Sequence, residues 1–158
     1  MFGEKLIHIL VVIAISMVPG LEIRFAIPAA AAFGMSWEWG YIWGLIGNIL
    51  PIPFLLKYLK PFFRYISKFR IFRKISRRVV KRVIRKIRQN PMLLKYTLLG
   101  LVIFVAIPIP GTGVWTGAMI AAILNIETRY AFPALALGAA AAGLIVLGAI
   151  LGFLHIAF

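Results

Sequence analysis

The chain has 158 residues, of which 63% are apolar, and its net charge is +14. A soluble domain is about 45–50% apolar, and so short a chain has too little interior to hide the excess from water. These values exclude an ordinary soluble domain and favour a membrane protein. Cysteine is absent, which excludes disulfide bonds and thiolate metal sites. His8 and His155 stand alone, so we expect no metal site and no cofactor.

The first half of the chain starts with a short apolar stretch, residues 6–18, that ends at the Pro19–Gly20 pair. Another short apolar stretch follows. Trp37–Leu56 then provides about the 20 apolar residues that a spanning helix needs. A signal peptide is the alternative interpretation of residues 1–20. It is disfavoured because the charged pair Glu22 and Arg24 stands where small neutral residues would precede a cleavage site.

The positive charge is concentrated in the segment that follows this half. Between Lys57 and Lys95 there are 15 basic residues and no acidic one. A nucleic-acid-binding protein also concentrates Lys and Arg, but it does not flank them with apolar stretches long enough to cross a bilayer. We therefore expect no nucleic-acid partner.

The basic segment is predicted to form an amphipathic helix along the membrane surface. Its apolar residues recur at steps of three and four, which places on one helical face Ile66, Phe69, Phe72, Ile75, Val79, Val83 and Ile87. Residues 64–88 can therefore anchor the chain, fix its topology or gather anionic lipid headgroups. By the positive-inside rule, this linker is expected in the cytoplasm and both termini outside a plasma membrane.

The second half repeats the order of the first. An apolar stretch that starts at Tyr96 is interrupted at Pro110–Gly111, and Tyr130–Leu154 is again long enough to span. The arms before the two Pro-Gly pairs are only about 13–15 residues long, roughly 20 Å as helices. We therefore predict that each half contains a hairpin that enters the bilayer and returns. The alternative is that each hairpin arm spans the bilayer fully.

An offset of 91 residues places Pro19–Gly20 on Pro110–Gly111 and Gly47 on Gly138. Internal repeats of this kind are typical of transporters. The predicted fold is an all-α integral membrane protein of two inverted repeats, each a re-entrant helical hairpin plus a transmembrane helix, joined by the basic amphipathic helix. The single membrane domain, 1–158, divides into repeat one at 1–59, the linker at 60–92 and repeat two at 93–158.

Glu22 and Arg24 are the first candidate site residues. Ionisable groups at membrane depth cost several kcal/mol unless they are paired or hydrated, so they are functional candidates by default. Residues i and i+2 of a regular helix do not face each other. Either the backbone is unwound here, or each side chain finds another partner. The alternatives to a functional role are a buried ion pair that fixes the hairpin and an interfacial location.

The second candidate is the break in the second half. Glycines permit unusual backbone angles and prolines cannot donate, so we expect exposed backbone dipoles and anion-attracting helix N-termini from Pro110, Gly111, Thr112, Gly113, Trp115 and Thr116. A hairpin tip without a ligand is the alternative. Asn48 would bond across helices or contact substrate. Arg129, beside Glu127, is expected to anchor the last helix at the interface, with a secondary role in binding.

Three motifs resemble those of the small multidrug export protein family: LEIRFAIP at 21–28, IGNILPIP at 46–53 and PIPGTGVWTGA at 108–118. That family resembles the wider DedA-type (VTT) membrane proteins, which carry paired re-entrant hairpins. Glu22 and Arg24 match the E-x-R motif of the family, and its second loop is matched by Pro110, Gly111, Gly113 and Trp115. The resemblance implies a transporter-like fold and ion-coupled movement of a lipophilic substrate.

The sequence favours a transporter or exporter of an amphipathic or lipophilic substrate, with Glu22 as the proton-sensitive group and Arg24 as the headgroup ligand. One alternative is a flippase or scramblase for a phosphorylated lipid carrier, such as polyprenyl phosphate, or for phospholipid. Another is a non-transporting organiser that binds anionic lipid. P-loop, H-E-x-x-H and G-x-S-x-G motifs are absent, so we expect no enzyme activity and no ATP-driven transport by this chain alone. A homodimer would widen the small translocation path.

Overall fold

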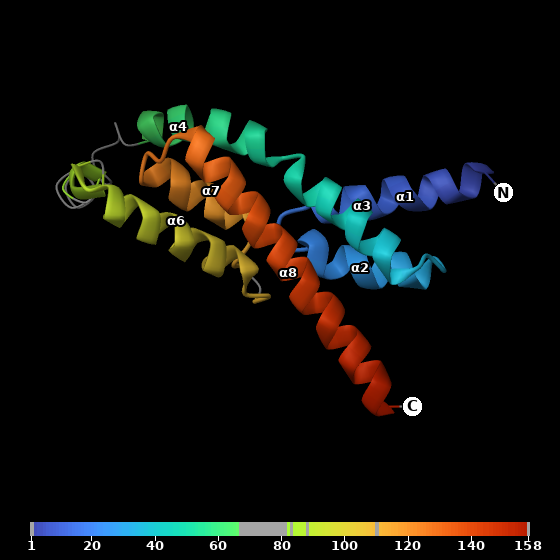
Figure 1. Ribbon diagram of the computed structural model, residues 1–158. Coiled ribbons are helices and arrows are strands. Elements are labelled where there is room, and N and C mark those ends of the chain that lie inside the picture. Colours follow the sequence, from blue (N-terminus) through green and yellow to red (C-terminus); the bar gives the residue numbers. More distant parts are fainter. Residues whose placement is uncertain (1, 67–81, 83, 88, 110, 158) are drawn as a thin grey trace.

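A computed structural model describes residues 2–66, 82, 84–87, 89–109 and 111–157. Every regular element in these ranges is a helix, and Figure 1 labels them. The helices are α1 (Phe2–Met17), α2 (Glu22–Ala32), α3 (Trp37–Ile49), α4 (Ile52–Ile66), α6 (Pro91–Ala106), α7 (Val114–Ile123) and α8 (Thr128–Ala157). The expected amphipathic helix at 64–88 falls largely outside the described residues.

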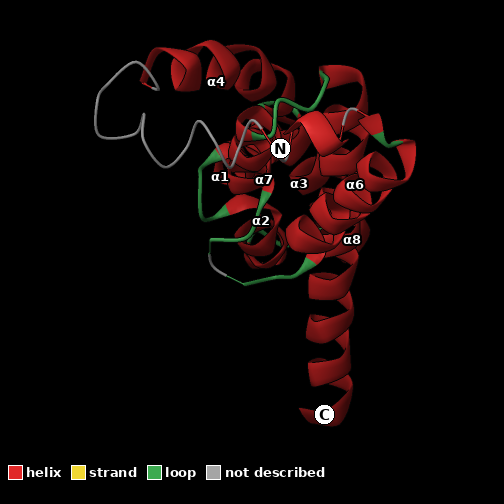
Figure 2. Cartoon of the chain, turned by 90° about the vertical axis from the view of Figure 1, so that its left-hand side faces the viewer, coloured by secondary structure: helices red, strands yellow, loops and turns green. Residues whose placement is uncertain are grey.

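The helices of each half form a hairpin followed by a longer helical stretch. In Figure 1 the α1–α2 hairpin occupies the right of the molecule and the α6–α7 hairpin the left, and their breaks face each other in the middle. α8 runs diagonally from beside α4 and α7 at the upper left to the lower right, past both breaks. Figure 2 shows the other helices gathered together, with the end of α8 projecting away from them. The two chain ends lie opposite the ends of α4 and α6 that flank the basic segment.

The bounds of the helices recur at the offset of 91 residues. The last residues of α2 and α7 are 91 residues apart, and so are the first residues of α3 and α8. The turns after α2 and α7 match as well. Gly34 has a φ of 72°, and Asn125 at the corresponding position has a φ of 53°. Glycine adopts this left-handed conformation freely, and asparagine adopts it more readily than most other residues.

The glycines that this offset pairs sit at equivalent helix crossings. A Cβ added to Gly47 of α3 would lie 2.5 Å from the carbonyl oxygen of Ile13 in α1. One added to Gly138 of α8 would lie 2.7 Å from the Cβ of Val105 in α6. Real Cβ atoms do not approach so closely, so each glycine lets a hairpin arm pack directly against its long helix. Small residues at such crossings are typical of membrane helix packing.

The long stretch of the first half differs from the expected single helix over Trp37–Leu56. α3 ends at Ile49 and α4 begins at Ile52, with a turn at Leu50–Pro51 between them. Proline has no N–H to donate and its ring clashes with the carbonyl four residues earlier, which breaks the helix here. α8 also contains Pro133, but that residue is in the first turns of the helix, which continues unbroken for 30 residues.

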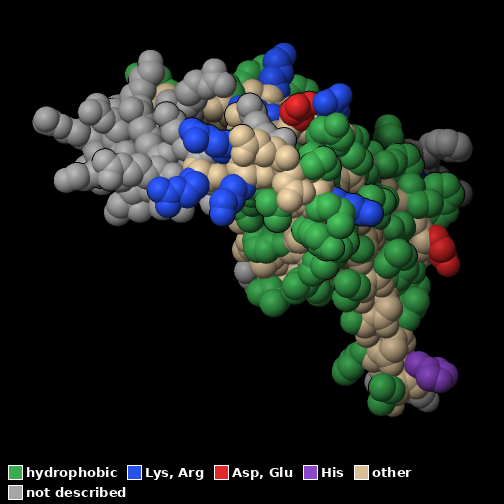
Figure 3. Space-filling model, turned by 60° about the vertical axis from the view of Figure 1, so that its left-hand side comes forward, with side chains coloured by type: hydrophobic (Ala, Val, Ile, Leu, Met, Phe, Trp, Pro, Cys, Tyr) green, Lys and Arg blue, Asp and Glu red, His purple; other side chains and the backbone are tan. Residues whose placement is uncertain are grey.

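Two helical stretches, Trp37–Phe63 and Thr128–Phe153, are long and apolar enough to cross a membrane. Only 39% and 33% of their most apolar windows is buried in the protein, so most of this apolar surface faces outward. The face in Figure 3 shows apolar side chains over most of the body, while Lys and Arg gather at the end beside the basic segment. This distribution suits a hydrocarbon solvent around the helices and water or headgroups at one end.

Two buried clusters place the breaks against α8. The larger joins α4, α6, α7 and α8 and includes Leu56, Leu101, Val105, Val114 and Leu135. In a second cluster, Ile23 and Ile27 of α2 pack with Ala142 of α8. α8 therefore contacts both hairpins and holds the two breaks in one place.

Candidate functional site

Each helix break contains a glycine in the same backbone conformation; the first break is residues 18–21, between α1 and α2, and the second is residues 107–113, between α6 and α7. Gly20 follows α1 with a φ of 88°, and Gly111 follows α6 with a φ of 91°. This left-handed region is open to glycine at no steric cost and is unfavourable for most other residues. The sequence prediction of unusual backbone angles at the second Pro-Gly pair agrees with the φ of Gly111. Pro110 itself lies outside the described residues.

Glu22 is the first residue of α2 and projects into the second break. It is 5% exposed, and its φ of 53° is a left-handed value that costs a non-glycine residue about 1–2 kcal/mol. Its carboxylate lies directly against Gly113, the N-cap of α7. Oε1 accepts a long hydrogen bond of 3.5 Å from the backbone N–H of Trp115. A carboxylate at this position is attracted by the positive end of the α7 dipole.

Arg24, two residues further on, reaches the other end of the same break. Its guanidinium donates to the backbone carbonyls of Ile107 (3.2 Å), Ile109 and Thr112, and to the Thr112 hydroxyl at 3.3 Å. Ile107 is the C-cap of α6, so the cation lies at the negative end of that helix dipole. The Thr112 hydroxyl is a donor within reach of two carbonyl oxygens, that of Ile107 at 2.7 Å and that of Ile109 at 2.8 Å.

Trp115, just after the second break, makes a hydrogen bond to the end of α1 at the first break. Its indole Nε1 donates to the carbonyl of Met17, the last residue of α1, at 3.1 Å. Trp115 stands 91 residues after Arg24, so corresponding residues of the two halves donate to carbonyls at the ends of corresponding helices. We call the set Glu22, Arg24, Gly113 and Trp115 the break clamp.

The geometry argues against one alternative for Glu22 and Arg24, a buried ion pair between their two side chains. Among the described residues no ion pair joins the two side chains, because the carboxylate faces α7 while the guanidinium faces the end of α6. Each therefore has its own partner in the second break. The opposite charges are matched to the opposite ends of two helices, which explains why both occur within three residues.

Two buried side-chain polar atoms lack hydrogen-bond partners in the described part of the chain, Asn48 Oδ1 and Arg24 Nε. Asn48 is 1% exposed on α3, but its oxygen does not make the interhelical bond that a mid-span amide usually makes. Buried polar atoms are normally satisfied, so an unpaired one indicates a ligand, a water or a functional strain.

Two further site residues predicted from the sequence, Thr116 and Arg129, are not part of the break clamp. Thr116 is half-buried on α7, and its hydroxyl makes no hydrogen bond to another described residue. Arg129 pairs with Glu127 at 2.7 Å, with side chains 69% and 60% exposed, and lies 4.7 Å over the Tyr130 ring. Because it is at the exposed start of α8, Arg129 does not join the break clamp.

Some contributors to this region were not predicted from the sequence. Ser16 is fully buried, and its hydroxyl donates to the carbonyl of Gly44 at 2.5 Å, which ties the end of α1 to α3. Ile107 and Ile109 act through backbone carbonyls, which their side chains do not reveal. Two features of the sequence could have indicated these residues. One is the single hydroxyl of Ser16 next to the end of an apolar stretch, and the other is the alternation of Ile107 and Ile109 with prolines.

The fold and the site together define a helical membrane protein with two broken helical hairpins that bind each other at their breaks. The model of one protein family, described as "Putative small multi-drug export protein", matches residues 22–145, and the chain belongs to that family. The match starts at Glu22 and includes every residue of the break clamp. No curated protein and no solved structure matches the chain.

Proposed function

We propose that this chain is a small transporter that exports an amphipathic or lipophilic substrate through the place where its two helix breaks meet. The observation that carries the proposal is the break clamp, in which Glu22 and Arg24 occupy the backbone groups of the second break and Trp115 those of the first. Broken helices that expose backbone dipoles at membrane depth are the usual binding sites of repeat-built transporters.

The lengths of the hairpin arms support re-entrant hairpins. α1, α2, α6 and α7 contain 16, 11, 16 and 10 residues. At about 1.5 Å per residue none of them reaches the roughly 30 Å of a hydrocarbon core. Two inverted repeats with a cytoplasmic basic linker then place both termini outside the plasma membrane, and both breaks near the bilayer midplane.

The break clamp supplies a mechanism for coupling to protons. Ionised Glu22 is held by the positive N-terminus of α7, and that attraction disappears when the carboxyl takes up a proton. Protonation would therefore loosen the contact with Gly113 and Trp115 and let the two hairpins separate. Arg24 would then exchange its carbonyl partners for an anionic substrate group, to which a guanidinium binds with two parallel hydrogen bonds.

A lipid with a phosphate headgroup is the substrate class that Arg24 favours, which makes a flippase or scramblase for polyprenyl phosphate or phospholipid the second candidate. The unpaired Arg24 Nε provides a further donor for a phosphate oxygen. A lipophilic cation would instead require Glu22 as its partner. A non-transporting membrane organiser is the third candidate. It would need the basic linker but not the break clamp.

Binding to the purified protein separates these candidates. The panel contains polyprenyl phosphate, phosphatidylglycerol and a lipophilic cationic dye, each measured with wild type, Glu22→Gln and Arg24→Ala. Glu38→Gln and Arg129→Ala are matched controls, because both side chains are exposed and lie outside the break clamp. The same variants are then assayed for substrate movement in proteoliposomes with and without a pH gradient.

For a phosphate-bearing substrate we expect Arg24→Ala to abolish binding and transport while both controls behave as wild type. For a proton-coupled exporter we expect Glu22→Gln to bind the substrate but to lose the dependence of transport on the pH gradient. If neither variant changes binding or transport, the break clamp is not the site. Loss of function only on neutralising the basic linker would then favour the organiser.

A further inference from the structure

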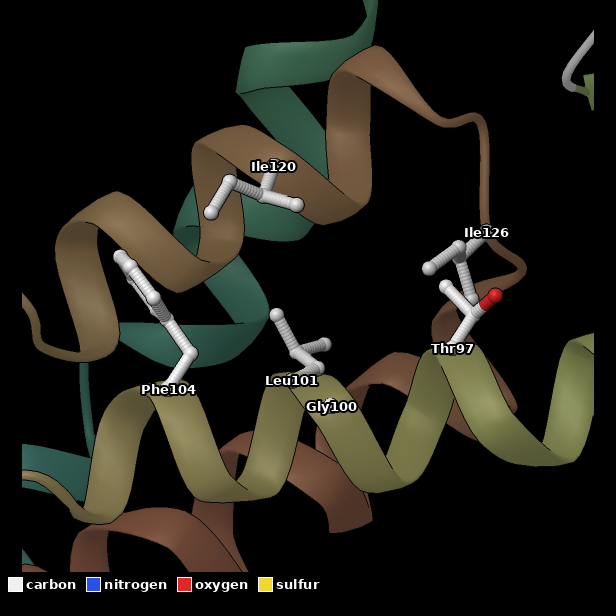
Figure 4. Close-up of a pocket in the computed structure, with 6 residues that line it drawn as sticks. All are labelled: Thr97, Gly100, Leu101, Phe104, Ile120 and Ile126. Carbon is white, nitrogen blue, oxygen red and sulfur yellow. The ribbon is translucent and has the colours of Figure 1, made fainter.

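A pocket away from the break clamp opens between α6 and α7 (Figure 4). Its volume is about 200 Å³, and its walls are formed by Thr97, Gly100, Leu101, Phe104, Ile120 and Ile126. The single side-chain polar group in this lining is the Thr97 hydroxyl, which already donates to the carbonyl of Leu93 at 2.7 Å. An apolar pocket without free polar partners does not hold ordered water. It is suited to hydrocarbon.

Gly100 gives the pocket its depth. A Cβ added there would meet nothing within 4 Å, because the space beside this turn of α6 is open. In Figure 4, Ile120 of α7 faces Leu101 and Phe104 of α6 across that space, and Ile126 lies near Thr97. Thr97 and Phe104 are seven residues apart, so the pocket follows α6 for about 10 Å. That is room for several methylene groups of an extended chain, but not for a helix of another protein.

Positive charge lies at one end of the pocket. The ammonium of Lys60, in the middle of α4, donates to the carbonyl of Ile126 at 2.5 Å. Lys95 is exposed on α6, but it stands two residues before Thr97 and so projects from a different face of the helix than the pocket wall. Figure 3 shows Lys and Arg gathered at this end of the molecule. The other end of the pocket, at Phe104, is three residues before the α6 C-cap in the break.

We propose that this pocket binds one hydrocarbon chain of an anionic phospholipid from the surrounding leaflet. The phosphate lies at the Lys60 end, and the chain runs along α6 toward Phe104. Charge complementarity sets the orientation of the lipid, because the anionic headgroup is attracted to the basic end of the pocket and the hydrocarbon chain is buried against the apolar walls. This site is distinct from the break clamp, and it exists whether or not the chain transports that lipid.

The test uses phosphatidylglycerol that carries a photoactivatable diazirine in one acyl chain, with the full-length protein in lipid nanodiscs. Irradiation should attach the label to peptides from α6 and α7 that contain Thr97–Phe104 and Ile120. Gly100→Leu fills the pocket from α6 and should reduce this labelling several-fold. The matched control is Gly148→Leu, since a Cβ at Gly148 of α8 also meets nothing within 4 Å and lies outside the pocket. Its labelling should equal that of wild type.

Ile120→Trp fills the pocket from the opposite wall and provides a second variant if Gly100→Leu does not fold, as judged by thermal unfolding. The same diazirine chain on phosphatidylcholine should label the pocket several-fold less than on phosphatidylglycerol. Unchanged labelling in a folded pocket-filling variant would overturn the proposed site. Equal labelling by the two lipids would overturn the anionic headgroup. Because the readout is labelling and not transport, either result is independent of the proposed function.

Discussion

Gly113→Ala tests whether the break clamp holds the two hairpins together. Gly113 has a φ of −160°, an extended conformation that alanine also adopts, so the backbone itself tolerates the change. The new methyl group would instead occupy the position of the Glu22 carboxylate. Overpacking a filled site costs about 1–3 kcal/mol, and losing a hydrogen bond to a charged group costs about 1.5–3 kcal/mol.

Because the Trp115 N–H bond is long, we take the lower end of that second range and expect destabilisation of about 2.5–4.5 kcal/mol in total. The free energy of unfolding would be measured by denaturant titration in detergent micelles. In a Glu22→Ala background the clash is absent, so Gly113→Ala should then cost less than about 1 kcal/mol. Gly148→Ala is the control. Its added methyl meets no atom within 4 Å and should be neutral or mildly stabilising.

Equal destabilisation by Gly113→Ala with and without Glu22 would refute this reasoning. It would mean that the effect arises in the backbone of the break and not from contact with the carboxylate.

Three further predictions use the same unfolding assay. Trp115→Phe keeps the ring but removes the indole N–H that bonds Met17, and should cost about 0.5–1.5 kcal/mol; no loss would show that this bond is not maintained. Gly47→Leu and Gly138→Leu should each destabilise by about 1–3 kcal/mol or more, because both glycines sit at close helix crossings; a neutral result at either would contradict the packing. Arg129→Gln should change stability by less than about 1 kcal/mol, because its pair with Glu127 is exposed; a larger loss would place Arg129 in a buried network.

The sequence alone indicated the class of the protein and the order of its elements. Apolar stretches of particular lengths, interrupted at Pro-Gly pairs, predicted where helices break, because proline lacks a donor and glycine tolerates left-handed angles. The offset of 91 residues also followed from the sequence. Helix ends and turn angles in the structure recur at that spacing. The helix breaks are local features, so they can be derived from neighbouring residues, and the offset follows from comparing the two halves.

The partners of the candidate site were decided by the tertiary structure. Composition and depth singled out Glu22 and Arg24, but their contacts lie more than 80 residues away in the sequence, at the two ends of a different broken helix. Those contacts go largely to backbone amides and carbonyls, which carry no sequence signature. The role of Gly113 as the surface against which a carboxylate packs could likewise appear only once the hairpins were placed together.

The pocket between α6 and α7 was also decided by the tertiary structure. In the sequence, Gly100 is one more small residue in an apolar stretch. Its role in forming the pocket comes from the empty space beside it between α6 and α7. Local chemistry therefore determined which segments are helical, where they stop and which solvent surrounds them. Only packing between distant segments decided which charges meet which helix ends and where an apolar surface is left hollow, because both depend on relative positions that no short stretch of sequence encodes.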